Sequence, residues 1–397
     1  MKQQSLAVFF APCPRGLEPL LAQELTQLGG QEVRQTSGGV ECRGPFTLCY
    51  RLNVESRLAS RILWRVGEGP CRTDQDLYRL TFEQPWPERF SVRSFFKVRI
   101  IAQRSTLKSL DFATLRVKDA ICDRFVQVCG NRPTVDKHHP DIPVVVYLEG
   151  QQATWYLDTS GAPLFKRGWR KAAGEAPIRE NLAAGLLELT GWTPEHVLLD
   201  PMCGAGTFLI EAALKGKGLS PGKGRNFAFT KLSNFDGQAW ARLRQVPARN
   251  LSSGAPLELY GYDQNVQALE MARINCRGLG FSEIHWQQKD ALEIVPPATQ
   301  GIMVTNPPYG VRMGDHHELE EWYPTFGNLL KQRFAGWKVY IFTADLRVPK
   351  LIRLSPSRKI PLFNGPLESR LYEFQMVSGG HRKEVRMAKQ AGGGIVG

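Results

Sequence analysis

The segment Asn306-Pro307-Pro308-Tyr309 combines residue types that can hold a planar amino group. Proline lacks a backbone N–H and has a restricted φ, so Pro307-Pro308 makes a rigid turn with exposed carbonyl oxygens. The Asn306 side-chain oxygen and the Pro307 carbonyl can both accept hydrogens from one NH2 group, which frees the nitrogen lone pair for attack on an electrophile. Tyr309 offers a ring on which a base can stack. The alternative interpretation is a plain turn without a chemical role.

A glycine-containing turn lies upstream, between a strand-like run at 197–199 and a helix-like run at 207–214. Its glycines let the backbone turn tightly and approach a ligand where a Cβ would clash. Leu209 stands where dinucleotide-binding turns carry a third glycine, which disfavours a pyrophosphate ligand. The residues expected to contact a ligand here are Asp200, Pro201, Met202, Cys203, Gly204, Gly206 and Thr207.

Three carboxylates, Asp200, Asp263 and Asp290, end successive strand-like runs. S-adenosylmethionine would use all three, because its α-ammonium suits Asp200, its ribose hydroxyls suit Asp263 and its adenine amine suits Asp290. Taken alone, Asp263 could instead cap the next helix, and Asp290 could be an exposed loop acid. Methyl transfer to the amino group at Asn306 would then depend mainly on in-line positioning. Further cofactor contacts are expected from Gln264, Ala291 and Asn306.

These residues are positioned by alternating strand-like and helix-like runs. The alternation predicts an α/β fold with a doubly wound, mostly parallel sheet. Asn364-Gly365, a pair favoured in hairpin turns, separates two strand-like runs at 360–363 and 371–377. An antiparallel terminal hairpin on such a sheet is the architecture of Rossmann-like methyltransferases. The other strand-like runs are 197–199, 257–260, 283–287, 301–305 and 338–342, and the helix-like runs are 178–189, 207–214, 265–277 and 320–334.

The N-terminal part mixes strand and helix signals in the manner of small α+β modules. Helical spacing is predicted at 17–28 and 46–63, and strands at 5–12 and 38–42. Basic residues crowd the segment 93–139, where ten Lys and Arg against four Asp leave a net charge of ten minus four, or +6. Such a surplus favours contact with a polyanion, and its alternative is a solvated basic face.

Charge and composition narrow the class of protein. The 397 residues carry a net charge of +13, which supports a polyanionic partner. No apolar run reaches the roughly 20 residues that span a bilayer, and the short run at 6–10, followed by Pro12 and Pro14, does not suit a signal peptide. We therefore expect a cytoplasmic protein. The eight cysteines show no C-x-x-C pair, and His316 and His317 lack a carboxylate pattern, so no metal is expected.

The combination of Asp200-Pro-x-Cys-Gly-x-Gly-Thr with Asn306-Pro-Pro-Tyr resembles the N-amino-group methyltransferases. More widely, residues 6–377 are similar to the THUMP-domain RNA methyltransferases, and among these to the guanine-N2 methyltransferases of 23S ribosomal RNA. The segments that carry the wider likeness are Arg15-Gly-Leu-Glu, Ser56-Arg-Leu-Ala-Ser-Arg-Ile, Val117-Lys-Asp-Ala-Ile, 158–170, Ala176-Pro-Ile-Arg-Glu and Asn364-Gly-Pro-Leu.

The resemblance implies a domain order, a site and partners. Residues Asn306, Pro307, Pro308 and Tyr309 would form the acceptor site, beside S-adenosylmethionine. Partners would be 23S ribosomal RNA or a pre-ribosomal particle, without a membrane, and the protein would be a monomer. A second fused methyltransferase domain, which some relatives carry, is not expected. The implied domains are a ferredoxin-like element at 1–60, an overlapping THUMP RNA-binding domain at 45–159, a linker at 160–177, a Rossmann-like methyltransferase domain at 178–378 and a flexible basic tail at 379–397.

Several functions stay open at this point. The same Asn306 segment could serve guanine N2 in tRNA, adenine N6 in a nucleic acid or a glutamine amide in a protein, and the basic N-terminal part disfavours the last. A non-catalytic RNA-binding ribosome-assembly factor is the alternative of another class, which the intact acids and glycines disfavour. Ala205 stands where relatives often have serine. The insert 215–256 could line the RNA path or pack its aromatic side chains onto the domain.

Overall fold

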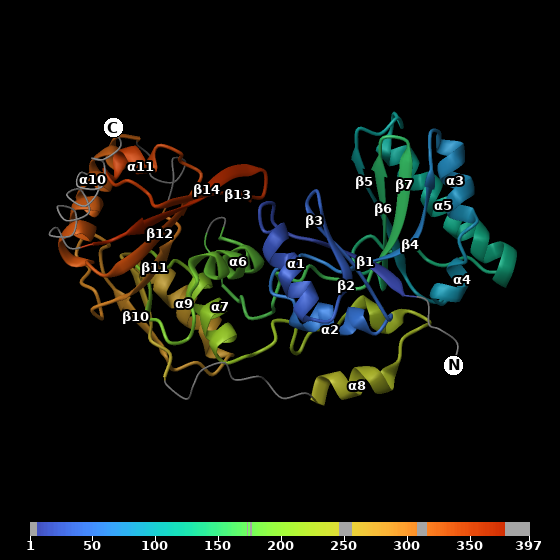
Figure 1. Ribbon diagram of the computed structural model, residues 1–397. Helices are drawn as coiled ribbons and strands as arrows, with labels where there is room; N and C mark the ends of the chain where they lie inside the picture. The colour runs from blue at the N-terminus through green and yellow to red at the C-terminus, as the bar shows by residue number, and fades with distance from the viewer. Residues whose placement is uncertain (1–5, 173, 175–176, 246–255, 308–315, 378–397) are drawn as a thin grey trace, which may run out of the picture. The chain divides into compact units, whose positions relative to one another are not determined.

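The computed structural model describes residues 6–172, 174, 177–245, 256–307 and 316–377, with only the backbone of 316–318 (Figure 1). The chain forms two compact units. Among the described residues, unit 1 comprises 6–13, 17–167 and 220–245, and unit 2 comprises the rest. The insert therefore interrupts the chain of unit 2 but folds as part of unit 1.

Unit 1 is built on a seven-stranded sheet with the order β2-β3-β1-β4-β7-β6-β5. All neighbouring strands are antiparallel except β5 and β6, which are parallel. The strands are β1 (Ala7–Pro12), β2 (Gln31–Thr36), β3 (Gly39–Gly44), β4 (Leu63–Pro70), β5 (Phe96–Gln103), β6 (Ile142–Glu149) and β7 (Gln152–Asp158). The helices are α1 (Glu18–Gln27), α2 (Leu48–Glu55), α3 (Asp74–Phe82), α4 (Trp86–Arg89), α5 (Leu110–Cys129), the 3-10 helix η1 (Ala228–Lys231) and α8 (Gly237–Gln245).

The predicted helix over 46–63 is wrong in its second half. Helix α2 ends at Glu55, because Ser56 adopts an extended backbone with φ −65° and ψ 124°. The carboxylate of Glu24 on α1 accepts from the Ser56 hydroxyl at 2.6 Å and from the Arg57 N–H at 2.7 Å. The Arg57 N–H would bond within a continued helix, and the Glu24 carboxylate satisfies it instead, so the chain leaves the helix there.

The aromatic part of the insert packs against α2 within unit 1. Phe229 stacks on Tyr50 with ring centroids 4.6 Å apart, and Trp240 meets Phe229 edge-on at 5.1 Å. The backbone N–H of Asp236 donates to the Tyr50 hydroxyl at 2.8 Å, and that of Phe229 donates to the Thr159 carbonyl at 3.0 Å. Of the two expectations for the insert, the packing of its aromatic residues is the one observed.

Unit 2 is built on a second seven-stranded sheet with the order β10-β9-β8-β11-β12-β14-β13. Strands β8 to β12 are parallel, and β14 and β13 are antiparallel, which confirms the predicted fold class. Gly365 makes the hairpin turn with φ +63°. The strands are β8 (Leu198–Asp200), β9 (Leu259–Asp263), β10 (Ile284–Gln288), β11 (Gly301–Thr305), β12 (Trp337–Thr343), β13 (Arg358–Asn364) and β14 (Leu367–Gln375).

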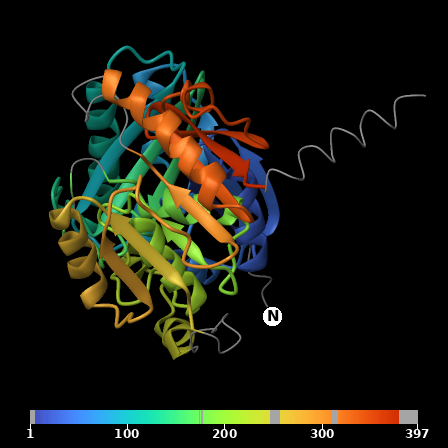
Figure 2. The ribbon, with the colours of Figure 1, turned by 90° about the vertical axis from the view of Figure 1, so that its left-hand side faces the viewer.

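Helices cover both faces of this sheet. On one side lie α6 (Glu180–Thr190), α7 (Thr207–Gly216) and α9 (Val266–Arg277), and on the other lie α10 (His316–Arg333) and α11 (Val348–Leu351) (Figures 1 and 2). Parallel strands covered on both faces are expected to be apolar throughout, and β11 and β12 are almost completely buried. Of the helices in the described ranges, none combines the length and apolarity needed to cross a membrane.

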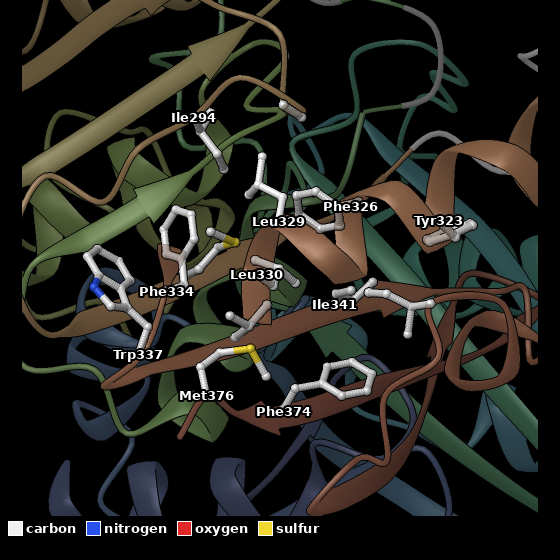
Figure 3. Close-up of a cluster of buried hydrophobic side chains, with 14 of the residues drawn as sticks. Ile294, Tyr323, Phe326, Leu329, Leu330, Phe334, Trp337, Ile341, Phe374 and Met376 are labelled. Atoms are coloured by element: carbon white, nitrogen blue, oxygen red, sulfur yellow. The ribbon is translucent and has the colours of Figure 1, made fainter. Parts of the chain in front are cut away.

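A cluster of large apolar side chains fixes α10 against the sheet (Figure 3). Phe326 and Leu330 on α10, with Phe334 directly after its end, pack with Ile341 on β12 and Phe374 on β14, and all five are inaccessible to solvent. Burial of a side chain of this size stabilises a fold by about 1.5–3 kcal/mol. The cluster therefore holds α10 beside the carboxyl end of β11, where the acceptor segment begins.

Candidate active site

Polar side chains follow four adjacent parallel strands in unit 2. In the spatial order β10-β9-β8-β11, the residues at or just after the strand ends are Asp290, Asp263, Asp200 and Asn306. Because the carboxyl ends of parallel strands share one edge of the sheet, residues far apart in sequence meet there. All four line one cavity of about 450 Å³. This volume is in the range of small-molecule sites.

The cavity brings together most of the residues predicted from sequence. Gly206 does not line it, and Pro308 and Tyr309 lie outside the described residues, as do the side chains of His316 and His317. In the part of the chain that is described, no three His, Cys, Asp or Glu side chains are placed to hold a metal ion. The predicted residues that line the cavity are Asp200, Pro201, Met202, Cys203, Gly204, Thr207, Asp263, Gln264, Asp290, Ala291, Asn306 and Pro307.

Gly206 shapes the site without lining it. It is the N-cap of α7 with φ +80°, a conformation that favours glycine. A Cβ at this position would lie 2.6 Å from the Trp286 ring of β10. The glycine therefore lets the loop after β8 turn directly into α7 against the Trp286 ring of β10.

Asp263 anchors the glycine loop to β9. One of its carboxylate oxygens accepts from the Gly204 N–H at 2.9 Å, and the other accepts from the Asn265 N–H at 2.9 Å. The N-cap of α9 is Asn265, whose side chain accepts from the Gln267 N–H at 2.8 Å. The interpretation of Asp263 as the helix cap is therefore wrong. Each carboxylate oxygen keeps a lone pair for a further donor, because such an oxygen accepts about two hydrogen bonds.

Asp200 is a buried carboxylate with only 2% of its surface exposed. The Met202 N–H donates to it at 3.2 Å, and no Lys, Arg or His of the described chain pairs with it. Burial and, to a smaller extent, the negative charge of Asp263 together raise the pKa of Asp200 to about 8, although the hydrogen bond from Met202 lowers it. A cationic group of a ligand would favour the ionised form of Asp200.

Asn306 presents an unsatisfied acceptor at the end of β11. Its side-chain oxygen is buried and has no hydrogen-bond partner among the described residues. A buried polar atom without a partner costs about 1–3 kcal/mol, so such atoms are rare unless a ligand completes them. Asp290, at the far side of the cavity, accepts from the Leu292 N–H at 2.8 Å. The cavity thus offers the Asn306 oxygen as an acceptor for an N–H group, together with the three carboxylates of Asp200, Asp263 and Asp290.

Sequence reasoning missed several residues of the cavity wall. Trp322 of α10 is the largest of them, and its ring stacks on Phe326 with centroids 4.7 Å apart. Ala205 and Phe208 lie in the same glycine-containing segment as the predicted contacts, so that segment could also have predicted them as cavity residues. Helical spacing alone does not tell a cavity residue from a core residue. The missed residues are Gly174, Pro177, Ile178, Ala205, Phe208, Asn265, Ala268, Met271, Leu319 and Trp322.

Three family models together match most of the chain. Residues 167–373 match the family model described as RMKL-like, methyltransferase domain, residues 8–63 match the RlmL ferredoxin-like domain, and residues 71–158 match the THUMP domain. The protein slr0064 of Synechocystis, named provisionally as an RNA methyltransferase, is 36% identical over 93% of this chain and 96% of its own length.

Two further relatives bear on the site. Ribosomal RNA large subunit methyltransferase K/L of Shewanella oneidensis is 37% identical over 91% of this chain, which spans 52% of that protein. The solved structure of SMU.472, described provisionally as a methyltransferase and bound to S-adenosylhomocysteine, superposes with a TM-score of 0.85 at 29% identity, covering 94% of this chain and 98% of that one. The chain therefore belongs to the THUMP-domain RNA methyltransferases, and its cofactor is S-adenosylmethionine.

Proposed function

We propose that the protein methylates the exocyclic N2 amine of a guanine in 23S ribosomal RNA. The observation that carries the proposal is the buried, unpartnered side-chain oxygen of Asn306 in the same cavity as Asp200 and Asp263. The choice of large-subunit RNA is supported by the likeness to ribosomal RNA large subunit methyltransferase K/L, and the choice of guanine N2 rests on the family resemblance of the sequence motifs. A ribosomal substrate would place the protein in the cytoplasm.

In this proposal three carboxylates hold the cofactor. Asp200 binds the α-ammonium group, Asp263 accepts from the ribose hydroxyls while its bond to Gly204 keeps the loop in place, and Asp290 accepts from the adenine amine. The cofactor supplies an electrophilic methyl group on its sulfonium. The chain contributes positioning and charge complementarity, which together account for a large share of the rate in such transfers.

Asn306 and Pro307 hold the acceptor. The Asn306 oxygen and the Pro307 carbonyl accept the two hydrogens of the guanine amine, so that the nitrogen lone pair leaves conjugation with the ring and faces the methyl group. The acceptor segment continues through Pro308 and Tyr309, and we propose that the Tyr309 ring stacks on the target base. Bond formation between nitrogen and the methyl carbon would break the sulfur–carbon bond of the sulfonium and leave a neutral thioether, and the amine proton would then pass to solvent water.

The test is methylation of RNA followed by nucleoside analysis. Purified protein is incubated with methyl-labelled S-adenosylmethionine and 23S RNA, either free or in pre-ribosomal particles, from cells that lack this gene. We expect N2-methylguanosine at one site, and no label in transfer RNA. N6-methyladenosine would replace the guanine assignment with the adenine one. Cofactor binding without any methylated nucleoside would favour a non-catalytic assembly factor.

A further inference from the structure

The two faces of the unit 1 sheet differ in composition. Residues paired directly across neighbouring strands share a face. One row across six strands runs through Cys42, Phe9, Trp64, Leu157, Val144 and Val98. This row is buried, apart from the partly exposed Trp64. It lies on the face of the sheet against which α1, α2, α3 and α5 pack (Figure 1).

The next row lies on the opposite face, which we call the open face. It runs through Arg43, Val8, Arg65, Tyr156, Val145 and Arg99. The neighbouring positions on the same face carry Phe10 on β1 and Tyr147 with Ile101 on β6 and β5. Basic, aromatic and aliphatic side chains therefore share the open face, where the helix-covered face has an apolar row.

In the described part of unit 1, no helix contributes a side chain to the apolar cluster on the open face. The small apolar cluster there consists of Leu63, Val145 and Tyr156, with Phe10 and Tyr147 packed beside them, and all five come from strands. The rings of Phe10 and Tyr156 lie 6.1 Å apart. Tyr156 is mostly buried under its neighbours, whereas Phe10 and Tyr147 are partly exposed and Ile101 is 39% exposed.

The uncompensated charge on the open face is positive. Among the described residues, the side chains of Arg34 and Arg99 form neither an ion pair nor a hydrogen bond, and both are exposed. The described acidic side chains on this face are each paired. Glu41 and Glu68 share Arg65, Asp158 pairs with Arg61, Glu149 with Arg104, and Glu32 with Arg43, so one carboxylate is in excess against the two free cations Arg34 and Arg99.

We propose that the open face binds unpaired RNA nucleotides, with bases stacked on Phe10 and Tyr147 and phosphates contacted by Arg99 and Arg34. Rings with exposed faces bind single-stranded bases, since every base has a π-face, and arginines beside them neutralise the backbone. A rigid duplex keeps its bases stacked on each other and offers no face to these rings. The proposal rests on the RNA substrate of the proposed function and adds which form of RNA is held.

The spacing of the strands suits several nucleotides. Phe10 lies on β1 and Tyr147 on β6, which are separated by three strand intervals. At about 4.8 Å per interval, the two rings stand roughly 14 Å apart across the sheet. The Tyr147 hydroxyl donates to the Gln103 side chain at 2.9 Å, which orients that ring from the neighbouring strand. The platform is therefore partly preorganised, and it lies within one unit.

The experiment measures RNA affinity without the cofactor, by fluorescence anisotropy, so that it does not depend on methyl transfer. The probes are a short single-stranded oligouridylate and a blunt RNA hairpin. Tyr147→Ala is expected to weaken oligouridylate binding about tenfold, and Tyr147→Phe, which keeps the ring and loses only the bond to Gln103, is expected to lose much less. The control Phe112→Ala removes a 50% exposed ring from α5 in the helical layer and should change nothing.

Arg99 is exposed, so Arg99→Ala should leave the fold intact. It therefore tests the proposal even if Tyr147→Ala fails to fold. It should weaken oligouridylate binding and lower the salt slope by about one. The proposal is overturned if Tyr147→Ala and Arg99→Ala bind oligouridylate as the wild type does, or if they lose hairpin affinity equally. Absence of oligouridylate binding by the wild type would overturn it too and would point to an acidic protein partner. Methylation by the wild type would still test the proposed function separately.

Discussion

The two sheets show how one chain presents polar groups to two kinds of ligand. In unit 2 both faces of the sheet are covered, so the polar groups gather at the carboxyl edge, and Asp200 is 2% exposed. In unit 1 the helices cover one face, and the cations, such as Arg99, stand exposed on the other. Buried groups act strongly on a small ligand that displaces water, whereas exposed cations act over a distance on a polymer and are screened by salt.

The largest expected effect removes the acceptor contact in unit 2. Asn306→Ala should lower the turnover number by about a hundredfold or more, as removal of other groups that stabilise a transition state does, and leave cofactor affinity nearly unchanged. Methyl incorporation into 23S RNA and calorimetry with S-adenosylmethionine measure the two quantities. Asn328→Ala, at an exposed position of α10, is the matched control. Turnover at the wild-type rate would remove Asn306 from the mechanism.

A smaller effect is expected from the ribose contact. Asp263→Ala should weaken cofactor binding by about 1.5–3 kcal/mol, because it removes charge-assisted hydrogen bonds. The loss includes the bond to the Gly204 N–H, so Asp263→Asn, which keeps an acceptor oxygen, should lose less. Glu270→Ala removes a carboxylate from the exposed face of α9 and serves as the control. Unchanged cofactor affinity in folded Asp263→Ala would refute the assignment.

The pH dependence of cofactor binding tests the buried charge. Burial raises the pKa of Asp200 from 3.8 to about 8, so the ligand-free protein holds a proton that must leave when the α-ammonium binds. Affinity should therefore rise with pH, by up to about tenfold per unit between roughly pH 6 and 7.5, below the α-amino pKa of about 8. Asp200→Asn should remove this slope. Equal slopes in both proteins would contradict the role of Asp200.

The same shift predicts a stability difference without cofactor. Because the folded pKa of Asp200 lies above the unfolded value, the ligand-free protein should lose stability as the pH rises from about 4 to about 8. Thermal unfolding of the wild type beside Asp200→Asn across this window measures it. A wild-type curve parallel to that of Asp200→Asn would show that the carboxylate ionises in the fold at no cost.

The smallest expected effects concern single charges in unit 1. Lys108→Glu, just before α5 and outside the open face, should weaken RNA binding slightly through its long-range charge, with a change of the salt slope smaller than that of Arg99→Ala. Lys118→Glu should act less, because Lys118 already pairs with Asp119 at 2.8 Å and is 25% exposed. Neither change should alter cofactor affinity, which depends on unit 2. An equal loss in both variants, or a loss of cofactor binding, would contradict the inference that RNA binding depends on unit 1 and cofactor binding on unit 2.

The carboxylates of unit 2 could be predicted because each follows a short apolar run that ends at a polar residue, and parallel strands bring such ends together. The prediction for helix α2 is too long because Leu58 and Ile62 serve the tertiary core at near-helical spacing. Strand β2 escapes prediction because nearly all of its residues are exposed and show no alternation. The capping box of Thr73 and Asp76 is a usable sequence signal for α3.

The roles of the cavity residues stay predictions. Which residues form the cavity wall depends on how the helices pack on the sheet, and sequence spacing does not determine that packing. Trp322 enters the cavity because α10 is held by its buried face, with Phe326 and Leu330 against the sheet. That direction follows from which face of α10 meets β12, and sequence spacing allows more than one such face. The insert posed the same difficulty, because its aromatic residues have their partner, Tyr50, far earlier in the chain.

The placement of the insert sets an order for folding during synthesis. The residues that cover Tyr50 and donate to the Thr159 carbonyl lie at 227–240. In the sequence they come after β8 and α7, which belong to unit 2. The N-terminal unit therefore cannot complete its core until part of the second unit has left the ribosome, although N-terminal domains generally fold first. Unit 1 would emerge with an open aromatic surface and close it late, so the growing chain couples the maturation of both units.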